Sequence, residues 1–230
     1  MNDYSIKLFL VRHGETEGNV DRAAHKRVAD HAIQLTEDGI DQARQAGQFL
    51  ADYFESQPEG ELITPANTRL WSSPYKRARE TGRHMSEYLG DFVGATREDI
   101  RLAEQQFGLF DGLESDEIAA QFPNEHQHYE KCKTFGGRFW ARMPGGESRF
   151  DVALRVHDFF GTIQRDAEKH GIHNLIIVGH GVTNRAIVMR WLHLTPEWFE
   201  AEENPNNASI RQITGTQDRG YVFPGFPPSE

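Results

Sequence analysis

Two short apolar runs, each followed by a histidine and a glycine, most constrain what this chain can fold into. Residues 8–11 read LFLV and precede Arg-His-Gly, and residues 175–178 read LIIV and precede Gly-His-Gly. A continuous apolar run of this length is typical of a strand that is buried on both faces of a parallel sheet. In open sheets of this kind, ligands bind beyond the carboxyl ends of the strands. If the two strands are neighbours, we expect His13 and His180 to point into one crevice.

Helical and extended segments alternate along the rest of the chain. Thr36 precedes two acidic residues and an apolar pattern at helical spacing, so it predicts a helix start, as does Ser73 before Pro74. A long amphipathic helix is expected after Gly146, with its end at Gly171. The other expected elements are strands at 69–72, 99–103 and 209–214, a helix at 115–122 that Pro123 stops, and a helix at 183–192. This alternation predicts an α/β fold, a three-layer sandwich in which helices flank a mostly parallel central sheet.

The length and the lack of repeats or linkers indicate how many domains the chain forms. The 230 residues are enough for one domain with a substantial core, and no repeat or linker-like stretch divides them. Residues 105–146 are the least regular part, because aromatic residues, glycines and charges are mixed there. We therefore expect a single domain over residues 1–230, with a substrate-facing insertion around residues 105–146.

Charge and cysteine content exclude several classes of partner. The net charge is −10, which argues against broad binding to nucleic acid or to membrane surfaces, so a site for an anion must be a local basic cluster. Cys132 is the single cysteine, which rules out an internal disulfide and fits a reducing compartment. The first apolar run is too short for the core of a signal peptide, and no stretch is long enough to span a bilayer. A cytoplasmic protein is therefore expected.

Arginines accompany the two histidines. Arg12 precedes His13, and Arg77 falls in the first turn of the helix predicted at Ser73. A helix N-terminus favours an anion, and a guanidinium can bind two phosphate oxygens at once, although Arg77 taken alone is also compatible with a solvated surface arginine. The set fits phosphoryl transfer, in which a neutral histidine attacks phosphorus and nearby positive charge both stabilises the transferred group and disfavours the imidazolium form. His180 would donate a hydrogen bond to a phosphoryl oxygen.

Five blocks of the sequence resemble those of the histidine phosphatase superfamily, also called the phosphoglycerate mutase-like family. They are LFLVRHGETEGN at 8–19, WSSPYKRARET at 71–81, LAEQQFGLFDG at 102–112, MPGGES at 143–148 and VGHGVTNRAI at 178–187. The blocks follow the family's order, and the segment from GRFWARMPGGES onward is similar to a small phosphatase-like branch with plant and fungal members. The resemblance implies the family's fold and a phosphatase that hydrolyses small phosphomonoesters.

The resemblance also implies roles for individual residues. His13 would be the phosphoryl acceptor, His180 a second catalytic histidine, and Glu104 the acid that protonates the leaving oxygen. The implied phosphate-binding residues are Arg12, Asn19, Arg77 and Gly181. Two departures from the family pattern are Phe110-Asp111-Gly112 and Gln34, which stands where a proline is usual. Candidate substrate contacts at the mouth of the site are Arg22, Gln34 and Arg138, and the last belongs to a basic-aromatic segment that is either packing or a lid.

Other readings of the sequence remain open. A cofactor-dependent phosphoglycerate mutase-type phosphotransferase would use the same residues, and a non-catalytic phosphate-binding protein is a further alternative. We expect no cofactor and no metal, since the pairs His25 with His31 and His126 with His128 lack standard zinc spacing. Histidines 84, 157, 170 and 173 are expected to be exposed or to flank helices. The expected partner is a small phosphorylated metabolite, without nucleic acid or membrane, and the oligomeric state is left open, with a homodimer as one option.

Overall fold

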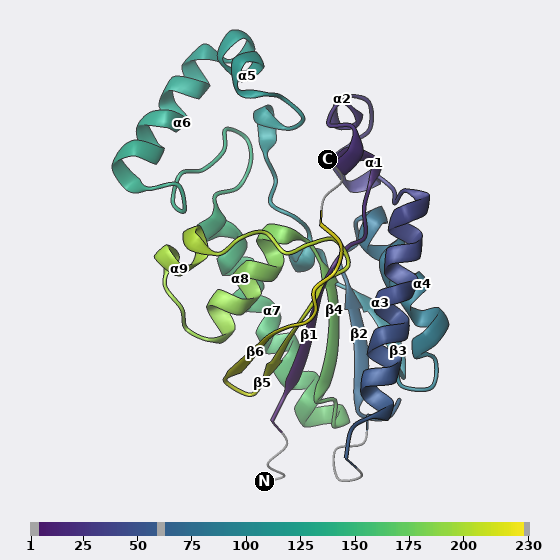
Figure 1. Cartoon of the computed structure of the whole chain (residues 1–230). Coiled ribbons are helices and arrows are strands. Elements are labelled where there is room, and N and C mark those ends of the chain that lie inside the picture. Colours follow the sequence, from purple (N-terminus) through teal and green to yellow (C-terminus); the bar gives the residue numbers. More distant parts are fainter. Residues whose placement is uncertain (1–4, 59–62, 228–230) are drawn as a thin grey trace.

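A six-stranded mixed sheet forms the centre of the computed structural model, which describes residues 5–58 and 63–227. The strands follow the order β3-β2-β4-β1-β5-β6 across the sheet (Figure 1). Their bounds are Lys7–Arg12 (β1), Thr68–Ser72 (β2), Ala95–Glu98 (β3), Asn174–Gly179 (β4), Ile210–Thr214 (β5) and Gln217–Phe223 (β6). The pairs β1–β4, β2–β4 and β2–β3 are parallel, and only β5 and β6 run antiparallel to their neighbours. The predicted mostly parallel sheet is confirmed.

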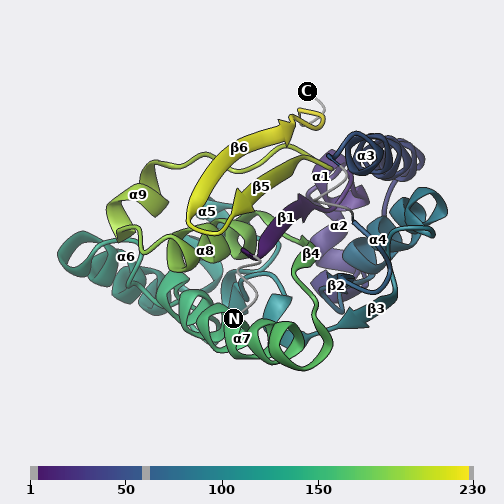
Figure 2. The ribbon, with the colours of Figure 1, turned by 90° about the horizontal axis from the view of Figure 1, so that it is seen from below.

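Helices cover both faces of this sheet (Figure 2). Helices α3 (Glu37–Glu55) and α4 (Lys76–Leu89) pack on one face, and α7 (Arg149–His170) and α8 (Gly181–Trp191) pack on the other. The remaining helices are α1 (Glu17–Val20), α2 (Ala24–Arg27), α5 (Ser115–Gln121), α6 (Pro123–Gly136) and α9 (Pro196–Ala201). None of the helices in the described ranges combines the length and apolarity that crossing a bilayer requires. The three-layer α/β sandwich expected from the alternation is the observed fold.

The apolar side chains of β1 pack into two separate cores, one on each face of the sheet. Leu8 and Leu10 pack with residues of α7 and α8, whereas Phe9 and Val11 pack with residues of α3 and α4. All four side chains are at most 2% exposed. Alternate side chains of a strand point to opposite faces, so a strand covered on both sides must be apolar at every position. Burial of each such side chain stabilises the fold by roughly 1.5–3 kcal/mol, which fixes β1 in the middle of the sheet.

Local side-chain hydrogen bonds set the helix ends that the sequence predicted. The Thr36 hydroxyl accepts a hydrogen bond from Gly39 N at 3.0 Å and caps α3. Ser148 caps α7, and Asp151 three residues later completes a capping box. Gly171 ends α7 with a φ of 67°, a left-handed conformation that glycine adopts without a steric penalty. These ends are local, so they follow from sequence.

Two predicted elements are wrong at their boundaries or in kind. Helix α4 begins at Lys76, with Tyr75 at the N-cap, and the Ser73-Pro74 pair lies before it. Residues 99–103 are not a strand, because β3 ends at Glu98 and Ile100–Leu102 is a short 3₁₀ helix. The Asp99 carboxylate accepts from Arg101 N at 2.9 Å, and such local side-chain bonds favour a turn over an extended strand.

Helix α6 and strand β6 are among the elements that were not predicted. Pro123 follows the end of α5, as expected, but it is also the first residue of α6, where the missing N–H of proline is not needed. Strand β6 is largely polar and lies at the edge of the sheet, paired only with β5. Because neither face of β6 is fully buried, the strand has no continuous apolar run by which the sequence could predict it.

Part of residues 105–146 forms a small core of its own around α5 and α6. This core consists of Phe110, Tyr129 and Ala141, separate from the two cores that flank the sheet. Helices α5 and α6 lie at the same end of the molecule as α1 and α2 (Figure 1). Two exposed ion pairs join the groups, Arg22 with Glu114 at 3.0 Å and Lys26 with Glu117 at 2.5 Å. The segment therefore stands over the end of the sheet where β1 and β4 terminate.

A buried ion pair ties β2 to α7 and gives a test of the fold. The side chains of Arg69 and Asp166 are each 8% exposed and contact one another. Replacing Asp166 by Ala leaves a buried guanidinium without its main partner, so we expect the free energy of unfolding to fall by about 3–5 kcal/mol. Urea denaturation measures the change, with Glu168→Ala on the exposed side of the same helix as control and an expected change within about 0.5 kcal/mol. Equal effects of the two substitutions would contradict this account.

Candidate active site

The sheet brings the two strand-end histidines together. Strands β1 and β4 are parallel neighbours, with Arg12 opposite Gly179 in the register. His13 N donates to Gly179 O at 3.1 Å, which extends the ladder by one bond past the strand end. The imidazole rings of His13 and His180 have centroids 5.2 Å apart and meet edge to face. Both side chains are buried, and the expectation that the two strands adjoin and bring the histidines together is confirmed.

His13 is held as a neutral ring with one defined tautomer. Its Nδ1 lies 2.8 Å from Gly14 O, and because a carbonyl oxygen only accepts, Nδ1 must carry the proton. The Nε2 atom is then unprotonated and has its lone pair available. Burial lowers the pKa of His13 well below its usual value, and the charges of Arg77 and Arg12 lower it further. The ring is therefore in the form that a nucleophile needs.

His180 has the opposite tautomer. Arg77 Nε donates to His180 Nδ1 at 3.3 Å, so in the neutral ring the proton lies on Nε2. That Nε2–H donates to the Ser73 hydroxyl at 2.8 Å. Burial, followed by the charge of Arg77, lowers the pKa of His180 well below its usual value. The pair thus offers one ring nitrogen with a lone pair, which can act as a nucleophile, and one N–H, which can donate to a negatively charged oxygen.

The loop after β1 is fixed by a close approach of two backbones. A Cβ on Gly39 would lie 2.0 Å from Glu15 O, and one on Gly14 would lie 2.4 Å from Gly39 O, so neither position accepts a side chain. Gly14 N donates to the Thr81 hydroxyl at 3.1 Å, and the buried Glu15 accepts from the Thr36 hydroxyl at 2.9 Å. The start of α3 and the middle of α4 therefore clamp the backbone that carries His13.

Arg12 has one buried N–H, that of Nε, without a hydrogen-bond partner among the described residues. Its Nη1 donates to Pro205 O at 2.6 Å, in the loop between α9 and β5. Burial lowers the pKa of Arg12, while the nearby carboxylate of Glu104 acts in the opposite direction. An unpaired buried N–H is costly, and an anion bound beside His13 would satisfy it.

Arg77 lies beside His180, but the two terminal nitrogens of its guanidinium, called the fork below, already donate to Asp30. Besides the bond from Nε to His180, Nη1 donates to Asp30 O at 2.5 Å and to Asp30 Oδ1 at 3.0 Å. Nη2 donates to Asp30 Oδ2 at 3.2 Å. The sequence pointed to a guanidinium open to two phosphate oxygens, and it gave no sign of Asp30. In this structure a carboxylate of the chain itself takes that bidentate position.

Glu104 lies over the N-terminal turn of α8, the helix that follows His180. Its Oε1 accepts from Gln105 N at 2.9 Å and from Thr183 N at 3.2 Å, and its Oε2 accepts from Val182 N at 3.2 Å. The Thr183 hydroxyl also donates to Oε1 at 3.2 Å. Gly181 is the first residue of α8, and a Cβ there would lie 2.9 Å from Asn204 Oδ1. One helix therefore positions both the second histidine and the carboxyl group.

Of the other sequence-predicted residues, Asn19, Gln34 and Arg22 have hydrogen-bond or ion-pair partners away from the two histidines. Asn19 Oδ1 accepts from Thr16 N at 3.0 Å and closes the capping box of α1. Gln34 bridges Glu17 at 2.8 Å and Lys76 at 2.7 Å. Arg22 is exposed and paired with Glu114, and Arg138 is exposed in the segment after α6. None of the hydrogen bonds found for these four residues runs to His13 or His180.

The remaining histidines differ from expectation at one position. His84 is buried, 4% exposed, and pairs with Glu87 at 2.8 Å, so its predicted exposure is wrong. It lies on the face of α4 that turns inward, which helical periodicity alone does not reveal for a residue flanked by charges. Among residues 5–58 and 63–227 no group of three or more histidine, cysteine, aspartate or glutamate side chains is arranged to hold a metal ion.

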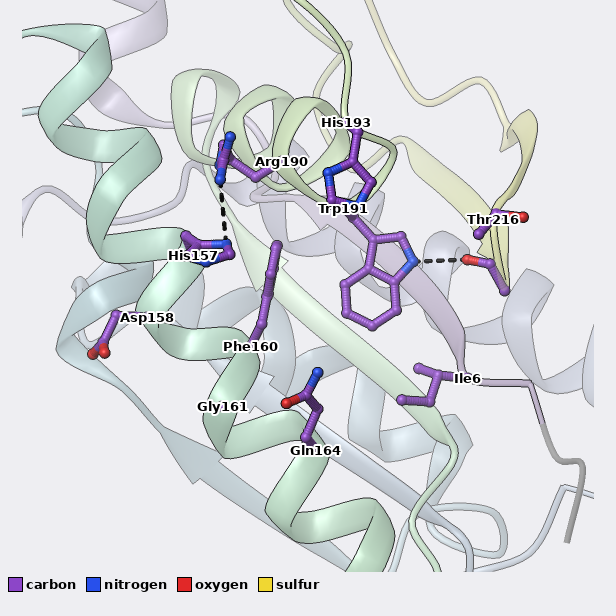
Figure 3. Close-up of a pocket in the computed structure, with 11 residues that line it drawn as sticks. Ile6, His157, Asp158, Phe160, Gly161, Gln164, Arg190, Trp191, His193 and Thr216 are labelled. Carbon is purple, nitrogen blue, oxygen red and sulfur yellow. Dashed lines mark hydrogen bonds between the residues drawn. The ribbon is translucent and has the colours of Figure 1, made fainter. Parts of the chain in front are cut away.

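A separate hollow of about 750 Å³ lies at the opposite end of the sheet. It is bounded by α7, the end of α8 and the turn between β5 and β6 (Figure 3). The Trp191 indole lies at its centre and donates to Gly215 O at 2.7 Å. Ile6, which precedes β1, lines it, whereas His13 follows β1, so the hollow shares no residue with the histidine site.

Comparisons with known proteins point in one direction. The model of the histidine phosphatase superfamily (branch 1) matches residues 8–223. The phosphoglycerate mutase-like protein AT74 of Arabidopsis thaliana is 36% identical over 223 residues, which cover 94% of this chain and 66% of that protein. A 2,3-bisphosphoglycerate-dependent phosphoglycerate mutase of Azorhizobium caulinodans is 31% identical, with 88% of this chain and 89% of that protein covered. The solved structure of a mycobacterial glucosyl-3-phosphoglycerate phosphatase with VO3 is similar at a TM-score of 0.67 and 25% identity, covering 97% of this chain and 100% of that one.

The lowered pKa values of the two histidines predict how stability depends on pH. Above about pH 6.5 both rings are neutral in the folded and unfolded chain. Below that pH the unfolded chain binds a proton at each ring and the folded chain does not, so stability is lost as the pH falls. Between pH 7 and pH 5 each ring contributes a loss of up to about 2 kcal/mol. We expect His13→Gln to lose less stability over this range than the wild type, as measured by urea denaturation at each pH.

The control for this experiment is His170→Gln, which changes an exposed histidine at the end of α7. Its loss of stability between pH 7 and pH 5 should follow that of the wild type. A His13→Gln variant with the same pH dependence as the wild type would show that burial does not keep His13 neutral.

Proposed function

The chain belongs to the histidine phosphatase superfamily, and we propose that it hydrolyses small phosphomonoesters through a phosphohistidine formed on His13. The observation that carries the proposal is the buried pair of neutral imidazoles with opposite tautomers, His13 with a free Nε2 and His180 with an Nε2–H. Arg12 and Arg77 lie beside the pair and supply positive charge. A nucleophile, a donor and two cations at one point are the parts that phosphoryl transfer uses.

In the first step His13 Nε2 attacks phosphorus, and the bond from phosphorus to the ester oxygen breaks. Arg12, Arg77 and the Nε2–H of His180 stabilise the charge on the remaining phosphoryl oxygens. Glu104 is assigned the role of general acid, which gives a proton to the leaving oxygen so that a neutral alcohol departs. Its place over the first turn of α8 puts this carboxyl group next to the helix that begins after His180.

In the second step water attacks the phosphohistidine. Glu104, now a carboxylate, takes a proton from that water, and the bond between His13 and phosphorus breaks to release inorganic phosphate. Each group named in these two steps is a side chain of the chain itself, and we propose a reaction without cofactor or metal. Asn19 and Gly181 are proposed to border the phosphate, with Asn19 using the part of its amide that the capping box leaves over.

The proposed substrate class is a small phosphorylated metabolite. The rim of the site is polar, with Arg22, Gln34 and Arg138 as the proposed contacts for the part of the substrate beyond the phosphate. The mycobacterial phosphatase with a similar fold is named for a phosphorylated sugar acid, which supports a phosphomonoester of this size. A cytoplasmic location is proposed on the single free cysteine, which fits a reducing compartment.

A second candidate is a mutase that returns the phosphoryl group to another hydroxyl. The similarity to a bisphosphoglycerate-dependent mutase at 31% identity favours it, and the same residues would serve. The two functions differ in what accepts the phosphoryl group. Steady release of inorganic phosphate without added bisphosphoglycerate supports hydrolysis, whereas isomerisation of a phosphoglycerate that requires that cofactor supports the mutase.

Replacement of the nucleophile tests the mechanism. We expect His13→Ala to lower kcat by at least about 10⁴-fold, since the group that forms the covalent intermediate is removed. Release of inorganic phosphate from a panel of metabolite phosphates measures the effect, and His157→Ala, an exposed histidine of α7, is the control. Near-normal turnover by a folded His13→Ala protein would refute the phosphohistidine.

The role of Glu104 is tested by varying the leaving group. With alkyl phosphates, whose leaving oxygen needs a proton, we expect Glu104→Gln to lower kcat by about 10²–10⁴-fold. With p-nitrophenyl phosphate, whose phenolate leaves unaided, the loss in the first step should be far smaller. Rapid-quench measurement of that first step compares the two substrates, and an equal loss with both would assign Glu104 a structural role at α8.

A further inference from the structure

The two arginines of the site differ in what they already bind. A guanidinium has five N–H donors, and hydrogen bonds from Arg77 to His180 and Asp30 account for four of them. Arg12 has no carboxylate partner in the described part of the chain, and its buried Nε has no acceptor there. Only one N–H of Arg77 is left for a substrate while Asp30 holds the fork.

The contact between Arg77 and Asp30 is largely shielded from water. The side chains are 6% and 17% exposed. Arg77 also stacks on Tyr75, with the guanidinium carbon 5.0 Å from the ring centroid, which fixes the plane of the fork. The charge interaction is therefore stronger than that of an exposed ion pair, and a dianion arriving at the same fork must displace or share with this carboxylate.

A second acid, Asp111, interacts electrostatically with Asp30. Burial raises the pKa of Asp111, and the charge of Asp30 raises it further. His25 is another titratable neighbour of Asp30, with Nδ1 3.6 Å from Asp30 Oδ1. A phosphate bound at Arg77 thus meets the carboxylate of Asp30 on the same guanidinium, whereas Arg12 donates to the carbonyl oxygen of Pro205.

We propose that Asp30 is a positioning residue that competes with the phosphoryl group for Arg77, and so sets how tightly phosphate binds and how readily it leaves. This inference rests on the proposed function in one respect only, that the histidine site binds phosphate. Asp30 lies in the one-turn 3₁₀ helix Asp30–Ala32, between α2 and α3. As the phosphoryl group enters, Arg77 exchanges the carboxylate for phosphoryl oxygens, and as inorganic phosphate leaves, Asp30 takes the fork again.

The test is the affinity of the protein for inorganic phosphate, measured by titration calorimetry without turnover. We expect Asp30→Asn to bind phosphate about tenfold more tightly than the wild type, since it removes a like charge beside the bound dianion. With substrate, KM and the inhibition constant for phosphate should fall together, while kcat does not rise. Asp30→Ala should shift the affinity in the same direction, which guards against an effect peculiar to the amide.

Two controls separate competition from a structural role. Asp21→Asn makes the same change of charge at a nearby position in the sequence, where the carboxylate pairs with Arg27 and not with Arg77. This variant should leave the affinity for phosphate unchanged. In an Arg77→Lys background, which abolishes the fork, Asp30→Asn should give much less than its tenfold gain. Additive effects of the two substitutions would show that Asp30 does not act through Arg77.

The outcomes also separate this inference from the proposed function. Unchanged or weaker phosphate binding in both Asp30 variants overturns the inference, because Asp30 then only supports the fold of the arginine, even if the wild type is an active phosphatase. Tighter binding in a protein that hydrolyses no phosphate ester upholds the inference and refutes the proposed function.

Discussion

The parallel pairing of β1 with β4 is the constraint on which the site depends. Both strands are buried on both faces, so their apolar side chains fix them at the centre of the sheet between two helical layers. Their register sets Arg12 opposite Gly179 and ends both strands at the same level. His13 and His180 follow at once, and the backbone bond from His13 to Gly179 holds the two loops together. A shift of one residue would turn one imidazole to the wrong face.

Burial at this point gives the histidines their chemistry. The chain has a net charge of −10, but the charges that lower the pKa of His13 are those of Arg77 and Arg12. Water is excluded, so the charged form of each ring is disfavoured twice, by desolvation and by the arginines. Hydrogen bonds then choose the tautomers, because Gly14 O can only accept and Arg77 Nε can only donate. The result is a ready nucleophile beside a ready donor.

The negative charge of the chain is kept close to the site but apart from the nucleophile. Glu104 accepts hydrogen bonds from the backbone N–H groups of Val182 and Thr183 in the first turn of α8. Asp30 pairs with Arg77. Arg12 keeps a buried Nε–H without a partner among the described residues. The site thus combines strong positive charge with internal anions, an arrangement suited to binding a phosphoryl group without holding the product tightly.

The sequence by itself determined the α/β class, the two central strands, the ends of α5 and α7, the start of α3 and the two strand-end histidines, because each follows from local pattern: apolar runs, caps and glycines. The same local reading failed at Ser73, which looks like a helix cap but serves as the acceptor of His180, and at His84, which turned out buried. It gave no sign of Asp30, which lies 47 residues from Arg77. Such contacts join segments far apart in the chain. Only the tertiary structure therefore decided which arginine has an unpaired N–H among the described residues, which nitrogen of each imidazole carries the proton, and where Glu104 lies. These depend on distances across the fold, which local sequence does not encode.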